Sequence, residues 1–282
     1  MTTTLVAEPK LDVEEPRTSG EDLARAAKRR ERINTWTWRL TGYAFFLGIW
    51  EFASGRWMDE NLLPGPTKVF ETFGVLWQSG QLPGAFAATL TRIGIGFSIA
   101  FVVGILVGIL MQNRWLYGFF RDAVTIGVTT PGLIWALITA IIFGNRAVGP
   151  LTAIVLTTFA IITVNVSEGI KSLPKDLIDM AKSFGVGVVK RNRQIVIPHL
   201  APFIFTGVRF GFSIAWKVTV LTEVFSSSTG IGFEMRTATQ LFRLPEFLTW
   251  ILAFYFLALF LEKVVLEVIE RRFFSWRAEL KT

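Results

Sequence analysis

Three charged side chains, Arg209, Lys217 and Glu223, stand inside an apolar stretch at about residues 203–225. A charge within a bilayer is costly, so such residues often mark a substrate or ion pathway. We expect Lys217 to offer a cationic donor to an anionic solute such as a sulfonate, a carboxylate or nitrate. Alternatively, Lys217 pairs with a carboxylate such as Glu223, or snorkels to the outer surface. Trp216 and Trp135 are the aromatic candidates for the same pathway.

The chain lacks the residues that most catalytic and metal sites require. It has no Cys and one His among 282 residues, which excludes disulfides and thiolate ligands and makes a histidine-built metal site implausible. No Gly-x-x-x-x-Gly-Lys-Ser/Thr loop is present to hold nucleotide phosphates, and residues 185–190 have the wrong spacing for one. We therefore predict no metal, no cofactor and no covalent catalysis in this chain, and a membrane enzyme is the weakest alternative.

Residues 168–202 form a second segment of interest, because they join two apolar stretches and are too long for a simple connector. Pro174 suits the first turn of a helix, and Gly185 can take the left-handed conformation that ends one. On that helix one face is apolar, which predicts a partner groove, or else a lipid surface, against it. The apolar residues are Leu177, Ile178, Ala181 and Phe184.

These residues must be positioned by membrane-spanning helices. The chain is 51% hydrophobic with a mean hydropathy of +0.48, and its apolar residues are concentrated in long runs of the length that crosses a bilayer. We predict an all-α protein with about six spans and a kink at Pro131 in the third. The predicted spans are residues 40–55, 93–111, 123–145, 147–167, 203–225 and 247–265.

The basic residues are distributed unevenly along these runs. Residues 1–39 hold eight Lys and Arg and residues 171–193 hold six, whereas the opposite loops hold five in all. Basic loops stay in the cytoplasm, so we predict that both termini are cytoplasmic. The basic residues behind the net charge of +7 are expected to contact membrane lipid rather than nucleic acid. Residues 1–39 are expected to be a tail with a basic interfacial helix near Trp36 and Trp38, and 276–282 a second tail.

The loop between the fourth and fifth spans carries a recognisable motif. Asp179-Met180-Ala181, followed by Gly185, Ile195 and Ile197-Pro198, resembles the EAA loop of ABC importer permeases. The family pattern is Glu-Ala-Ala, then Gly, then Ile-x-Leu-Pro, and this sequence keeps the spacing. It replaces Glu by Asp179, one Ala by Met180 and Leu by Ile197, so charge or apolarity is preserved.

Further segments resemble the nitrate, sulfonate and taurine branch of that family over roughly residues 40–275. Each is short, but they occur in the order found in the branch. They are Leu63-Pro64-Gly65-Pro66, Thr89-Leu90 with Arg92, Gly96-Phe97, Thr206-Gly207-Val208-Arg209, Ala215-Trp216, Glu223 and Gly230-Ile231-Gly232.

The resemblance implies a type I ABC importer permease in the bacterial inner membrane, with a transmembrane domain at 40–275 that includes the coupling loop 168–202. Two ATPase subunits, which bind ATP and Mg, would dock on this loop. An extracytoplasmic binding protein would deliver the solute, and a second permease copy, most simply an identical one, would complete the pathway. The expected coupling residues are Leu177, Asp179, Ala181, Phe184, Gly185, Ile195 and Pro198. A stand-alone secondary transporter or channel is the alternative, but it leaves the loop unexplained.

Overall fold

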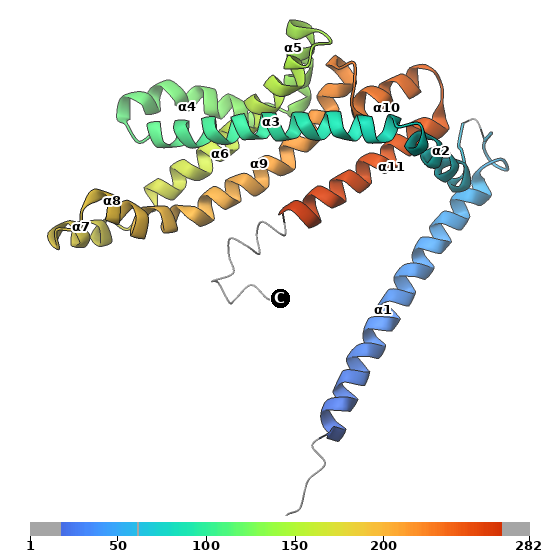
Figure 1. The fold of residues 1–282 in the computed structure, drawn as a ribbon, viewed down its shortest axis with the longest axis horizontal. Coiled ribbons are helices and arrows are strands. Elements are labelled where there is room, and N and C mark those ends of the chain that lie inside the picture. The colour runs from blue at the N-terminus through green and yellow to red at the C-terminus, as the bar shows by residue number, and fades with distance from the viewer. Residues whose placement is uncertain (1–17, 61, 267–282) are drawn as a thin grey trace, which may run out of the picture.

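The computed structural model describes residues 18–60 and 62–266 of the chain, and its regular elements there are all helices, as predicted. Residues 1–17, residues 267–275 of the predicted transmembrane domain and the predicted tail 276–282 lie outside the described residues. We refer to the two ends of the helical bundle as the α7 end and the α10 end. They are named after the short helices α7 (Lys175–Ser183) and α10 (Ile231–Gln240) in Figure 1.

Three long helices form the centre of the bundle: α3 (Gln81–Leu110), α6 (Val148–Lys171) and α9 (Ile197–Ser226). The glycines of α3 meet α6 in ascending order, so these two helices run parallel. Two glycines of α9 meet α6 in descending order, so α9 runs antiparallel to it. The close pairs are Gly96 with Ile154, Gly104 with Ile162, Gly108 with Val166, Gly207 with Asn165 and Gly211 with Thr158. Small residues thus let these helices approach closely within one chain.

This packing yields a first prediction. A methyl group on Gly104 would lie 2.7 Å from Ile162 Cβ, whereas one on Gly94 of the same helix would meet nothing within 4 Å. Gly104→Ala is therefore expected to destabilise the protein by about 1–3 kcal/mol, because α3 and α6 must separate. Gly94→Ala is expected to be neutral or stabilising. Thermal unfolding of both variants in detergent checks this, and equal shifts would show that the α3–α6 contact is not tight.

The third predicted span is two helices rather than one kinked helix. α4 (Arg114–Thr129) and α5 (Gly132–Phe143) meet at 105°. Pro131 lacks an N–H donor and disfavours the helical conformation in the residue before it, and Thr130 is accordingly extended at φ −75° and ψ 122°. Because α3 and α6 run parallel, the chain between them must return from the α7 end to the α10 end. We conclude that α4 and α5 form one broken span.

The N-terminal helix differs from the prediction in its extent. α1 (Thr18–Ala53) joins the predicted basic helix and the predicted first span into one helix of 36 residues. It reaches the bundle only at its C-terminal end, beside α2 (Pro66–Gln78), as Figure 1 shows. There Glu51 accepts hydrogen bonds from Thr67 Oγ1 at 2.5 Å and Thr67 N at 3.3 Å. The carboxylate in this span thus satisfies the N-terminus of α2.

At its C-terminal end the chain turns through α10 into α11 (Leu244–Phe260) and a π-helical turn at Leu261–Leu266. By length and apolarity, four of the described helical segments can cross a membrane, and the α4–α5 pair makes five. Six spans were predicted, and α1 accounts for the difference. Its apolar part contains Arg39 and Glu51, which lower its hydropathy.

Candidate functional sites

The predicted helix of the coupling loop is present as α7, and Gly185 ends it. Gly185 has φ +68°, its N–H donates to Lys182 O at 2.9 Å, and Val186 N–H donates to Ala181 O at 2.9 Å. This pair of hydrogen bonds is the Schellman motif, which requires a left-handed residue that glycine adopts without strain. Pro174 occupies the N-cap position, just ahead of the first turn.

α7 presents an apolar row, but not the row that the sequence predicted. Ala181 is buried, whereas Leu177, Met180 and Phe184 are 39%, 51% and 81% exposed. The sequence prediction placed Ala181 on the open face and overlooked Met180. The i, i+3, i+7 spacing of Leu177, Met180 and Phe184 was the signal that could have identified the exposed row.

Asp179, the acidic residue of the motif, is exposed and forms an ion pair with Lys182 at 2.8 Å. The hydrogen bond from Lys182 lowers the pKa of the Asp179 carboxyl. The carboxylate therefore remains ionised at neutral pH. At an exposed position such a pair adds little to stability.

Ile195 and Pro198, two of the expected coupling residues, do not lie in a turn between two separate helices. Instead α8 (Val188–Arg191), a π-helical turn at Asn192–Val196 and α9 make one continuous helical segment, Val188–Ser226. Pro198 cannot donate to the carbonyl four residues earlier, and the wider π turn directly before it accommodates the missing bond. With 39 residues, the segment is about 58 Å long.

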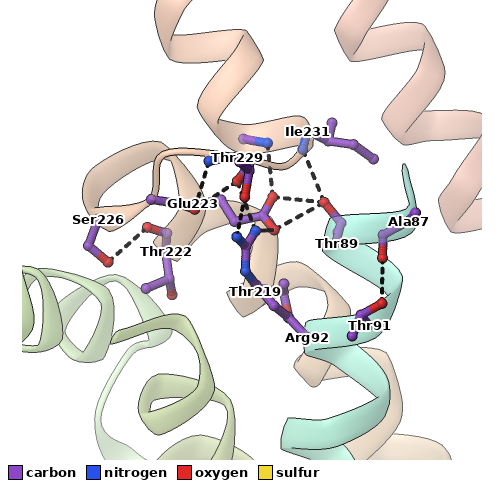
Figure 2. A network of polar contacts seen from close by, with 12 residues as sticks. Ala87, Thr89, Thr91, Arg92, Thr219, Thr222, Glu223, Ser226, Thr229 and Ile231 are labelled. Atoms are coloured by element: carbon purple, nitrogen blue, oxygen red, sulfur yellow. Dashed lines mark hydrogen bonds and ion pairs between the residues drawn. The ribbon is translucent and has the colours of Figure 1, made fainter. Parts of the chain in front are cut away.

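Glu223 lies near the α10 end of this segment, fully buried, in the network drawn in Figure 2. Its carboxylate accepts from Arg92 Nη1 of α3 at 2.5 Å and from Gly232 N of α10 at 3.1 Å. Thr89 Oγ1 lies 3.0 and 2.9 Å from the two carboxylate oxygens and accepts from Ile231 N at 3.0 Å. Glu223 is therefore a structural acceptor here. Glu223 thus pairs with Arg92 and not with Lys217 of the same chain, and its role in the pathway stays a prediction.

Arg92 and two glycines complete what we call the Glu223 network, which comprises Thr89, Arg92, Glu223, Thr229 and the backbone of residues 230–232. Arg92 also donates to Thr229 O at 2.8 Å and to Thr229 Oγ1 at 2.5 Å. Gly230 has φ +104°, and a side chain on Gly230 or Gly232 would collide with Glu223. Three of the short segments that resemble the nitrate, sulfonate and taurine branch thus meet at one site in the fold: Thr89-Leu90 with Arg92, Glu223, and Gly230-Ile231-Gly232.

Lys217 lies on the open side of the same helix. It is exposed, its ammonium group is 5.2 Å from the centre of the Trp216 ring, and no carboxylate among the described residues lies within 4.0 Å of it. One turn away, Ser213 Oγ donates to Glu262 at 3.4 Å. Lys217 is nine residues from the end of α9, about 13 Å. A cation in this position is available to an anion.

The two tryptophans are less open than predicted. Trp216 is buried among the side chains of α3, α10 and α11, against Phe254, so it does not line an open surface. Trp135 in α5 is half-buried. The indole N–H of each is buried without a hydrogen-bond partner among the described residues. Burying an unpaired donor is costly, and no pattern in the sequence indicates that these two indoles are unpaired.

A family model described as the binding-protein-dependent transport system inner membrane component matches residues 100–275 of the chain. The chain belongs to this family. It is therefore the permease subunit of an ABC importer, a multi-pass protein of the bacterial inner membrane that is not itself a catalyst. The matched region contains α7, Lys217 and Glu223, whereas Thr89 and Arg92 lie ahead of it.

Relatives of this permease fall in the nitrate, sulfonate and taurine branch. The bicarbonate transport permease CmpB of Synechococcus elongatus is 30% identical, covering 80% of this chain and 85% of the relative. The putative aliphatic sulfonates permease SsuC of Escherichia coli is 26% identical over 86% and 94%, and its taurine permease TauC is 26% identical over 82% and 86%.

The fold of this permease is that of a type I ABC importer permease. A chain of the MetNI methionine ABC transporter, in an inward-facing conformation, superposes with a TM-score of 0.58. The match covers 70% of this chain and 97% of that one, at 16% sequence identity. The predicted fold class is confirmed.

Proposed function

We propose that the permease is driven by separate ATPase subunits that dock on α7 and the residues around it. The observation that carries this proposal is the exposed row Leu177, Met180 and Phe184 on a helix that stands beyond the bundle in Figure 1. An amphipathic helix with an open apolar face fits a groove on a partner. Asp179, Ala181 and Gly185 shape this helix. ATP and Mg would be bound by the partner, because this chain has no phosphate-binding loop.

The continuous helix that follows α7 supports a mechanical role for this docking. Ile195 and Pro198 lie within Val188–Ser226, which begins four residues after Phe184 and extends to the α10 end. Closure of an ATPase pair would move two α7 helices together, and this segment would transmit the displacement to the opposite face. In this mechanism the permease transmits a movement and carries out no chemical step.

We propose that the solute is a small anion and that Lys217 contacts it. Lys217 is a cation without a carboxylate partner among the described residues, set in an apolar helix. The relatives named for bicarbonate, sulfonates and taurine all handle compounds with an anionic group. Half-buried Trp135 is a second candidate for the pathway.

The remaining partners follow from the same scheme. A charged side chain exposed on a spanning helix is unfavourable in lipid, which supports a second permease copy, proposed to be identical, enclosing an aqueous pathway beside Lys217. A binding protein would deliver the solute at the α10 end. The basic residues 171–193 at the α7 end support a cytoplasmic location for that end and for both termini.

Docking is tested by co-purification with an ATPase candidate. Phe184→Asp, which puts a charge on the apolar row, is expected to reduce ATPase recovery by about tenfold or more, as loss of a central apolar contact does. Ser183→Asp introduces the same charge at the neighbouring position, beside the row rather than within it, and is expected to retain the partner. Equal retention by both variants would show that the row is not the docking surface. Transport by the chain alone would favour a stand-alone carrier.

A further inference from the structure

The Glu223 network is more elaborate than stability requires. A buried ion pair must overcome the desolvation of both charges, and apolar side chains of similar volume often replace such a pair without loss of stability. Here Glu223 is fully buried and the Arg92 side chain is 11% exposed. Both carboxylate oxygens accept from donors of this chain, and Arg92 also donates to Thr229. The geometry of the network fixes the relative positions of the elements that it joins.

Those elements meet where the continuous helix Val188–Ser226 ends. Arg92 connects α3 with Glu223 of α9 and with Thr229 in the turn that follows it. From the other side, Arg236 of α10 donates to the carbonyl oxygens of Val224 at 3.1 Å and Ser227 at 2.8 Å. These bonds occupy carbonyls that the end of α9 leaves without helical partners. The corner between α9 and α10 is therefore held by an anion at the start of α10 and a cation at the end of α9.

We propose that Arg92 and Glu223 are positioning residues that make the α10 end of α9 move together with α3 and α10. The proposal rests on the proposed docking of an ATPase at α7. A displacement applied near α7 passes along about 58 Å of continuous helix. At the far end the displacement reaches the corner between α9 and α10. A stiff corner would move as a unit, whereas a flexible corner would deform and the displacement would end there. The network makes the corner stiff.

The absence of cysteine from the chain allows a direct test without knowledge of the solute. Ser228 is exposed in the corner and Gln194 is exposed near α7, so Ser228→Cys and Gln194→Cys each introduce the only thiol of this chain. Maleimide labelling of each cysteine is measured in the purified complex with the ATPase, with and without ATP and vanadate. In the otherwise unchanged protein, nucleotide is expected to alter the labelling rate at both positions.

The decisive comparison uses the double variant Arg92→Met/Glu223→Met, which removes both charges and keeps apolar volume. We expect the nucleotide response at Gln194→Cys to persist and that at Ser228→Cys to fall by about tenfold, the size of a typical coupling between sites. Arg243→Met/Glu246→Met, which removes a partly exposed pair 3.5 Å apart, is the matched control and should leave both responses unchanged. If the double variant does not assemble, Arg92→Gln/Glu223→Gln replaces it. Arg92→Lys, which keeps the positive charge, should retain more of the nucleotide response at Ser228→Cys than either double variant.

The two proposals fail in different ways. An undiminished response at Ser228→Cys in an assembled double variant would overturn the positioning role and leave docking intact. A protein without substitutions in the network that shows no nucleotide response at Gln194→Cys would overturn the docking itself. A purely stabilising network would lower the yield of the complex but keep the ratio of the two responses.

Discussion

Gly185→Arg is expected to abolish association with the ATPase and ATP-driven transport with it. Gly185 has φ +68°, a conformation that costs other L residues about 1–2 kcal/mol. A Cβ at this position would meet nothing within 4 Å inside the chain. The arginine side chain would therefore project into the space in which the partner is proposed to dock, next to Phe184. Co-purification and ATPase activity of the complex measure the effect.

Two further substitutions separate backbone strain from obstruction of the partner. Gly185→Ala carries the same strain without the bulk and should weaken docking only moderately. Gly185→Asn should come closest to the original protein, because asparagine tolerates the left-handed conformation. If all three variants behave alike, strain alone explains the result. If none of them affects docking in a folded protein, α7 is not the coupling helix.

The sequence predicted α7 well because the signals for it are local. A proline before the helix, a glycine after it and a 3.6-residue apolar period all lie within 12 residues, 174–185. The same kind of reasoning placed Pro131 at a break, but it could not give the 105° bend, which depends on how α3 and α6 pack on either side. Nor did it show that α8 and α9 continue through Pro198, since a π turn leaves no simple sequence signature.

The partner of Glu223 was beyond the sequence for a different reason. Arg92 is 131 positions away, and no period or spacing links the two. The sequence marked Glu223 as an unusual charge in an apolar helix. A buried carboxylate is stable only when it is paired and hydrogen-bonded, but the identity of its partner could not be predicted. The sequence prediction grouped Lys217 and Glu223 in one candidate pathway. In the fold, six residues separate them, and the Lys217 side chain is exposed whereas that of Glu223 is buried.

Lys217→Met is expected to reduce transport of the solute by about tenfold or more, because hydrogen bonds to a charged group contribute roughly 1.5–3 kcal/mol. Assembly with the ATPase should be unaffected, since Lys217 lies far along α9 from α7 and forms no ion pair with any described carboxylate. Lys217→Arg keeps the positive charge and should retain part of the activity. Uptake of labelled taurine, an alkanesulfonate and bicarbonate, each into proteoliposomes, is the measurement.

The matched control is Lys263→Met, which removes another exposed lysine, in the π-helical turn after α11. It changes the net charge by the same amount, so any general electrostatic effect on anion uptake would appear in both variants. A loss confined to Lys217→Met would assign a direct contact with the anion to that side chain. Full uptake by Lys217→Met would mean that its ammonium group only snorkels to the surface, and the selectivity for anions would then have to come from the binding protein.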